Sequence, residues 1–187
     1  AWEGKSGCFR TYQARNGMKL ENIVHLAKAN DGGIWITPHH YDPIYFDSRS
    51  HRFTSLSDMG IQLDCRSNLC AFADGDLLYV GHYRGGMSII DLKKKTTRRM
   101  LHDPSVPQSL PGHSVYSLYK DRLGHLWVGT EWGLGLLDSS TGRFTVFRHV
   151  PGRISSLVAD RVYDICETAD GKLWIACDVG GISILDL

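Results

Sequence analysis

The chain has 187 residues, 42% of them hydrophobic, and its 21 Lys and Arg residues nearly balance 20 Asp and Glu residues, which leaves a formal net charge of +1. This is the composition of a globular protein with enough apolar material for a core, and it excludes a disordered or fibrous chain. Without a surplus of clustered cations, binding to nucleic acid or direct contact with an anionic membrane surface is not expected.

Membrane and cysteine signals add little. The sequence has no apolar run of ~18 residues and no charged and then apolar leader, so we expect neither a membrane span nor a signal peptide within it. Five cysteines form no Cys-x-x-Cys pair, and an odd number cannot all pair within one chain, so the redox compartment stays open. We expect most of them to be small buried residues. The cysteines are Cys8, Cys65, Cys70, Cys166 and Cys177.

An internal repeat runs through the sequence. Four similar segments, each with an aromatic residue at its fourth position, are Gly32–Ile36, Asp76–Val80, Gly124–Val128 and Gly171–Ile175. Their aromatic residues lie 44, 48 and 47 positions apart, which is close to the roughly 40–50 residues of one β-propeller blade. Three other positions recur in register: an aliphatic residue nine or ten positions before the aromatic residue, a small residue two positions after it, and an Asp eleven or twelve positions after it.

In chain order, residues 1–21 predict the outer strand of a preceding blade, because Ser6–Tyr12 matches the strand expected at Thr141–Phe147. Residues 22–66, 67–113 and 114–160 each predict a blade of four antiparallel strands, and residues 161–187 predict a blade that lacks its fourth strand. The strands of the third unit are expected at Val115–Tyr119, His125–Thr130, Leu134–Asp138 and Arg143–Arg148. The predicted fold is all-β, with four β-propeller repeat units in this chain.

The recurring aromatic residue is expected to fill the space between neighbouring blades. We therefore expect Trp35, Trp127 and Trp174 to be buried. Trp132 lies in a loop and out of register, so we expect it to be partly exposed. A lone open arc would leave strand edges unpaired at both ends, so we expect either closure of the first strand onto the last blade or pairing with a second copy.

The third unit carries the motif of a known repeat. Asp121–Thr130 reads Asp-Arg-Leu-Gly-His-Leu-Trp-Val-Gly-Thr, and it is similar to the Asp-x-x-Gly-x-Leu-Trp-x-Gly-Thr of the two-component regulator propeller repeat. The match is weaker in the second unit, where Tyr79 stands in place of Trp. It is also weaker in the first unit, where Pro38–His40 stands in place of a small residue and a Gly-rich turn.

This resemblance implies the extracytoplasmic sensor region of a hybrid two-component system, that is, the periplasmic part of an inner-membrane protein. Such proteins occur in gut bacteria that degrade polysaccharides, where the region binds a glycan fragment and signals to a kinase. Members of the family carry propellers of about seven blades. Four units therefore imply either part of a larger ring or ends that close in another way.

A ligand is expected on the loops of one propeller face, because loops on a rigid scaffold vary without disturbing the core. Aromatic rings can stack on a sugar, and forked charged groups can bind its hydroxyls or a uronate. The candidate ligand-binding residues break the repeat on that face and are Tyr41, Tyr83, Arg84, Glu131 and Trp132. The predicted function is non-catalytic sensing of an oligosaccharide, with neither a cofactor nor a metal ion.

Two other classes of function remain open. One is a protein-interaction or dimerisation scaffold, which unpaired propeller edges favour. The other is a propeller lyase or glycosidase, for which His82 as general base with Glu131 is the only plausible acid–base pair. Zinc is not expected, because the neighbours His39 and His40 would point to opposite faces of a strand. Gly133–Gly135 lacks the third Gly of a dinucleotide-binding loop.

Overall fold

The structure, a computed structural model, describes Thr11, Tyr12, Met18 and residues 20–187. These described residues form fifteen β strands and no helix, so none of them belongs to a helix that could cross a membrane. The strands are β1 Ile23–Lys28, β2 Ile34–Pro38, β3 Ile44–Asp47, β4 Arg52–Ser55, β5 Asn68–Asp74, β6 Leu77–His82, β7 Met87–Asp91, β8 Thr96–Met100, β9 Val115–Lys120, β10 Leu126–Thr130, β11 Gly133–Asp138, β12 Arg143–Phe147, β13 Val162–Glu167, β14 Lys172–Cys177 and β15 Ile182–Asp186. The outer strand expected at Ser6–Tyr12 lies outside the described residues, except for Thr11 and Tyr12.

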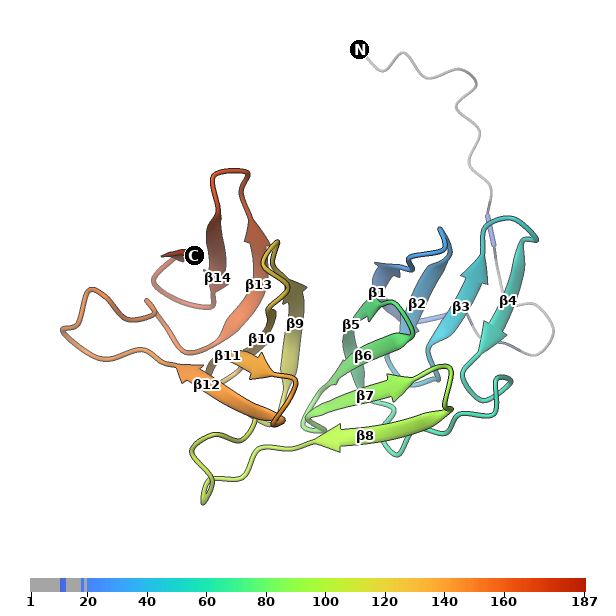
Figure 1. Ribbon diagram of the computed structural model, residues 1–187, viewed down its shortest axis with the longest axis horizontal. Coiled ribbons are helices and arrows are strands. Elements are labelled where there is room, and N and C mark those ends of the chain that lie inside the picture. The colour runs from blue at the N-terminus through green and yellow to red at the C-terminus, as the bar shows by residue number, and fades with distance from the viewer. Residues whose placement is uncertain (1–10, 13–17, 19) are drawn as a thin grey trace, which may run out of the picture.

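The strands form four antiparallel sheets in which each strand pairs with the next along the chain (Figure 1). We name these sheets blade 1 (β1–β4), blade 2 (β5–β8), blade 3 (β9–β12) and blade 4 (β13–β15). In the third unit, every strand begins and ends within one residue of its predicted bounds. The prediction of an all-β fold made of antiparallel propeller blades is confirmed.

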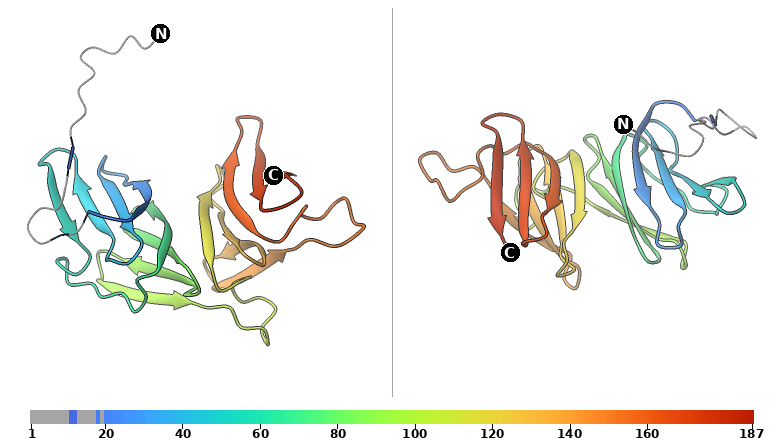
Figure 2. Two further views of the ribbon diagram at one scale, coloured as in Figure 1. Left: turned by 180° about the vertical axis from the view of Figure 1, so that it is seen from behind. Right: turned by 90° about the horizontal axis from the view of Figure 1, so that it is seen from above.

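The four blades lie in an arc that is open on one side (Figures 1 and 2). The first strands of successive blades, β1, β5, β9 and β13, contact one another in that order. Strands β1 and β13 stand on opposite sides of the opening, so the described residues of one chain do not close a ring. The expected closure or pairing of the ends therefore stays a prediction.

The recurring Asp holds the turn between the third and fourth strands of a blade. In blade 3 the Asp138 carboxylate accepts hydrogen bonds from the hydroxyl of Ser140 at 2.6 Å and from the hydroxyl of Thr141 at 2.7 Å. These bonds lower the pKa of Asp138 to about 2. Asp47 and Asp91 accept hydrogen bonds from backbone N–H groups of their own turns. The Asp recurs in the sequence because each of these three hairpins uses it as an acceptor.

The hydrophobic core lies in layers between neighbouring blades. Trp35 packs between blades 1 and 2, Trp127 packs between blades 3 and 4, and both are buried as predicted. The recurring small residue lets the next blade approach. A Cβ atom on Gly129 would lie only 2.8 Å from Val162 Cγ1 of blade 4, which is closer than real side chains come, so this position requires glycine.

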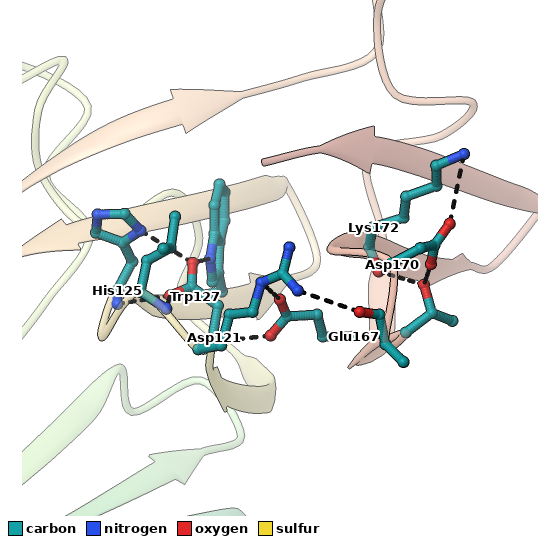
Figure 3. A network of polar contacts seen from close by, with 10 residues as sticks. Asp121, His125, Trp127, Glu167, Asp170 and Lys172 are labelled. Carbon is teal, nitrogen blue, oxygen red and sulfur yellow. Dashed lines mark hydrogen bonds and ion pairs between the residues drawn. The ribbon is translucent and has the colours of Figure 1, made fainter.

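A polar network at the turn after β9 orients Trp127 and joins blades 3 and 4 (Figure 3). Trp127 Nε1–H donates to Asp121 Oδ2 at 2.8 Å, and the backbone N–H of His125 donates to Asp121 Oδ1 at 2.9 Å. The next residue, Arg122, reaches blade 4, where its Nε lies 3.1 Å from Glu167 Oε1. One turn therefore positions a core aromatic residue and makes a polar contact between blades.

Trp174 departs from the burial pattern. Its side chain is 38% exposed, compared with 2% for Trp127, so the prediction that Trp174 is buried is wrong. Trp174 lies on the face of blade 4 that points away from blade 3, and no described residue forms a blade on that side. Cys166, which pairs with Trp174 across the sheet, is exposed as well. Of the four described cysteines only Cys70 is buried, so the expectation that most of them are buried is wrong. The repeat supplies the Trp, but burial also requires the next blade.

Candidate functional site

The loops that follow β2, β6, β10 and β14 carry the most variable side chains of the repeat. Each of these strands is the second strand of its sheet, so the loops that follow them are equivalent in the four blades. Four positions after the recurring aromatic residue the units carry His39, Tyr83, Glu131 and Asp178. At the following position they carry His40, Arg84, Trp132 and Val179, all exposed. This second loop position thus carries a different type of exposed side chain in each of the four blades.

Trp132 lies in an aromatic cluster with two histidines. Its ring centroid is 5.2 Å from that of His102 and 5.1 Å from that of His113, and both histidines meet it edge to face. The two histidines also contact each other, with their centroids 5.0 Å apart. Trp132 is nevertheless 43% exposed, as predicted for a loop residue. The cluster holds the indole in place while part of its surface stays open to a ligand.

A hollow of about 280 Å³ lies beside Trp132. Its wall is formed by the loop between β8 and β9 and by the end of β12. The lining side chains that bear on ligand chemistry are His102, Asp103, Pro104, Pro107, Trp132 and Arg148. An aromatic ring, proline rings and a guanidinium group therefore surround one space.

The loop between β8 and β9 is fixed by its own hydrogen bonds. His102 Nδ1 lies 2.7 Å from the carbonyl oxygen of Leu110, and the hydroxyl of Ser109 donates to the Asp103 carbonyl at 2.9 Å. The loop between blades 3 and 4 repeats the first contact, with His149 Nδ1 lying 2.7 Å from the carbonyl oxygen of Leu157. The wall of the hollow is therefore pre-organised by a repeated loop structure, which lowers the cost of ordering it on binding.

Glu131 connects loops of neighbouring blades. Its Oε1 accepts the backbone N–H of His113 at 2.9 Å, and its Oε2 accepts the backbone N–H of Ser114 at 2.6 Å. The hydroxyl oxygen of Ser114 in turn accepts the backbone N–H of Arg84 at 3.1 Å. Both carboxylate oxygens of Glu131 are therefore used within the protein. The structure brings Arg84, Glu131 and Trp132 into one connected set of loops.

Tyr83 and Tyr41 take different places. Tyr83 is exposed next to Arg84, whose guanidinium carbon lies 5.8 Å from the centre of the Tyr83 ring. Tyr41 belongs to the junction of blades 1 and 2, where its hydroxyl donates to Glu21 Oε1 at 2.9 Å and its carbonyl accepts Asn68 Nδ2–H at 2.8 Å. Tyr83 thus adjoins the connected loops, whereas Tyr41 stands at another junction.

Two segments of the chain match the model of a known family. Residues 109–132 and 156–178 match the model of the two-component regulator propeller. The chain carries two-component regulator propeller repeats. Each matched segment begins at the serine of the loop before the blade, Ser109 or Ser156, and ends in the loop after β10 or β14, at Trp132 or Asp178. The first matched segment contains Trp132 and three other residues that line the hollow, Ser109, Leu110 and Pro111.

One solved structure supports this assignment, and a second shares the fold. The extracellular domain of a putative hybrid two-component system from B. thetaiotaomicron is 31% identical, with a TM-score of 0.71 over 88% of this chain and 20% of that one. The extracellular domain of a putative one-component system from the same organism is 19% identical, with a TM-score of 0.65 over 95% of this chain and 23% of that one. The regulator propeller thus spans about a fifth of the length of these two domains.

A protein of similar length has the same fold. A computationally designed protein is 12% identical to the regulator propeller and has a TM-score of 0.62, over 96% of this chain and 99% of that one. At this identity the likeness concerns the fold alone. No curated protein matches the chain.

His82, the general base of the lyase alternative, is enclosed in the fold of the regulator propeller. Its side chain has no exposed surface, and its Nε2 lies 2.8 Å from the hydroxyl oxygen of Ser88. Burial, together with the smaller effect of the charge of Arg99, lowers the pKa of His82 to about 4. With both oxygens of Glu131 engaged as well, this pair is not placed to act on a ligand. Over the residues that the structure describes, no three His, Cys, Asp or Glu side chains are grouped to hold a metal ion.

Sequence reasoning missed His102 and Arg148 as partners of Trp132. A signal for His102 was present in the sequence. His102 stands seven residues before Ser109-Leu110, and His149 stands seven residues before Ser156-Leu157, which indicates a repeated loop structure. Arg148 had no such signal. Its place in the hollow depends on how the loop between β8 and β9 folds over the end of β12, where Arg148 Nη2–H donates to the carbonyl oxygen of Pro111 at 3.3 Å.

Proposed function

We propose that the chain is a ligand-binding segment in the extracytoplasmic, periplasmic region of a two-component regulator, and that it binds an oligosaccharide without converting it. The regulator propeller repeats and the 31% identity to the extracellular domain of a putative hybrid two-component system support a sensor region. Signalling to a kinase would then be a task of other parts of the parent protein.

The observation that carries the ligand proposal is the open surface of Trp132 beside a pre-organised hollow. An indole face suits the apolar face of a pyranose ring, and the stacking needs no charge on the sugar. Arg148 lines the same hollow and has donors beyond the one bonded to Pro111, and its planar fork suits paired hydroxyls or a carboxylate. A neutral or acidic oligosaccharide therefore fits this site better than an apolar or cationic ligand.

Calorimetric titration with a panel of neutral and acidic oligosaccharides tests the proposal. We expect weak to micromolar binding, at the strong end about −8 kcal/mol. Trp132→Ala should weaken it at least tenfold, and Arg148→Ala should weaken acidic ligands more than neutral ones. Trp174→Ala is the matched control, because Trp174 is similarly exposed but lies away from the hollow, and this variant should bind like the wild type.

Two results would contradict the proposal. One is a panel in which no saccharide binds, or in which binding survives Trp132→Ala unchanged. The other is a cleaved saccharide in product analysis after long incubation, which would favour the enzyme class instead. Retained thermal stability of Trp132→Ala is the check that a loss of binding comes from the site itself.

A further inference from the structure

The first strand of each blade carries a β-bulge near its beginning. Strands β1, β5, β9 and β13 each pair with the second strand of the same blade, and each pairing skips one residue. The skipped residues are Val24, Leu69, Tyr116 and Tyr163. A bulge redirects a side chain and interrupts the hydrogen-bonded ladder, and bulges are over-represented next to functional sites. The repeat therefore builds one redirected side chain into every blade.

The bulges lie on the inner side of the arc. Strands β1, β5, β9 and β13 are the edge strands of their sheets and contact one another in that order, so they border the central channel of a propeller (Figures 1 and 2). Leu69 and Tyr116 are only half-buried, although each has a neighbouring blade on both sides. This exposure is a property of the bulge position and does not depend on where the arc ends.

The bulged residues of blades 3 and 4 are two tyrosines in contact. The ring centroids of Tyr116 and Tyr163 lie 5.2 Å apart, and the ring planes are tilted by 54°. In this arrangement neither ring covers the face of the other as a parallel stack would. Blades 1 and 2 carry the aliphatic residues Val24 and Leu69 at the same position. The aromatic pair is therefore a feature of blade 3, which carries Trp132, and of the blade that follows it.

Arg161 and Asp178 supply polar groups beside this pair. Arg161 Nη1–H donates to Asp178 Oδ2 at 2.8 Å, and both side chains keep exposed surface. The pKa of Arg161 is raised, first by the hydroxyl of Tyr163 and then by the charge of Asp178. The charge of Arg161 also acts on Tyr116, so Arg161 lies beside both tyrosines. Since Asp178 balances its charge, the two side chains offer hydrogen-bond donors and acceptors without net charge.

Glu131 connects the tyrosine pair to the loop of Trp132. Burial and then the negative charge of Glu131 raise the pKa of Tyr116, and Glu131 directly precedes Trp132 in the chain. Val115, the residue before the bulge, pairs with Thr130. From the usual spacing of paired strands and of consecutive residues, the Cα atoms of Tyr116 and Trp132 lie no more than roughly 17 Å apart. A single ligand of several sugar units can therefore reach both places.

We propose that Tyr116, Tyr163 and Arg161 form a second subsite, which takes an uncharged sugar unit of the oligosaccharide bound at Trp132. This inference rests on the proposed function and adds the direction in which the ligand runs, from the hollow beside Trp132 to the inner side of the arc. The tyrosine rings present flat apolar surface to a pyranose ring, and the Arg161–Asp178 pair binds its hydroxyl groups. An acidic unit is disfavoured here, because Asp178 already neutralises the charge of Arg161.

Calorimetric titration with a size series of one saccharide tests the subsite. The probe is the neutral panel member that binds most tightly, used as uniform chains from the disaccharide upward. Wild-type affinity should rise at least tenfold with chain length and then level off, because long chains fill both subsites. Tyr163→Ala should remove this gain and leave the binding of short chains unchanged. Trp132→Ala should weaken short and long chains alike.

Further variants separate stacking from folding. Tyr116→Phe keeps the ring and should bind long chains like the wild type, whereas Tyr116→Ala should lose the gain. Leu123→Ala is the control, because Leu123 is 61% exposed in the turn at the opposite end of β9, and it should not change binding at any chain length. Thermal unfolding verifies that the alanine variants are folded. Asp178→Asn leaves Arg161 without its counter-charge, so long acidic chains should gain affinity in this variant.

The subsite and the proposed function can fail separately. Equal wild-type affinity for short and long chains would overturn the subsite, as would a gain with length that survives both Tyr116→Ala and Tyr163→Ala. In either case, weaker binding by Trp132→Ala would still support the oligosaccharide proposal. A series in which no chain binds the wild type would overturn both.

Discussion

Removing the indole of Trp127 should destabilise the protein far more than removing that of Trp174, although the repeat gives both residues the same place. Trp127 is 2% exposed between blades 3 and 4, and its Nε1–H is bonded to Asp121 at 2.8 Å. Truncating a core aromatic residue costs about 3–5 kcal/mol. Leaving the buried Asp121 without this donor adds about 1–3 kcal/mol. Trp127→Ala should therefore cost roughly 4–8 kcal/mol, as the sum of these two contributions.

Trp174→Ala should cost a fraction of this amount, because Trp174 is 38% exposed and lies outside the layers between blades. Urea unfolding followed by circular dichroism measures both free energies of unfolding, and Trp132→Ala provides a second exposed comparison. Equal losses for Trp127→Ala and Trp174→Ala would refute the reasoning that burial is supplied by the following blade.

Two substitutions and one titration test other parts of the fold. Gly129→Ala should destabilise the protein by about 1–3 kcal/mol, because the new Cβ atom would lie 2.8 Å from Val162 Cγ1. Urea unfolding measures this loss, and the control Ala176→Gly, at the equivalent place in blade 4, should show no such loss. The pKa of Asp138 is lowered to about 2, so its contribution to stability is present above the unfolded pKa of about 3.8 and is lost as the pH falls toward 2. Over that pH range the unfolding curves of Asp138→Asn should converge on those of the wild type. The pKa of His82 is lowered to about 4, so the wild type should lose stability as the pH falls from about 6.5 to 4. NMR titration measures the pKa of His82, and a value near 6.5 would contradict the enclosure of this side chain.

The repeating part of the fold could be predicted because each recurring residue has one local physical task. Asp138 accepts the hydrogen bonds of its own turn, and Gly129 stands where a side chain would strike Val162. The period of the repeat and the strand bounds follow from such positions. The burial of Trp174 could not be predicted in this way, because it depends on a neighbouring blade rather than on the residue's own unit.

The site could be predicted only in part. Trp132 was identified because it breaks the repeat in a loop, and it does have an exposed surface. Glu131 was identified by the same rule, yet both of its oxygens accept backbone N–H groups of the neighbouring loop, so its participation in binding stays a prediction. Departure from a repeat indicates that a position is free to vary. Whether the side chain faces solvent or joins another loop depends on contacts between units, which the period does not encode.

The tryptophans show how position decides what one residue type does. Trp35 and Trp127 fill the layers between blades and stabilise the arc. Trp174 has the same register and the same strand pairing, but it lies on an open face, where it becomes a contact residue for whatever covers blade 4. Trp132 is out of register and is held at its edges by His102 and His113, so its open surface is not committed to packing. If the Trp132 surface binds a saccharide, Trp132→Ala should weaken binding and spare stability, whereas Trp127→Ala should lower stability. That separation is what a repeat protein with nearest-neighbour packing should show.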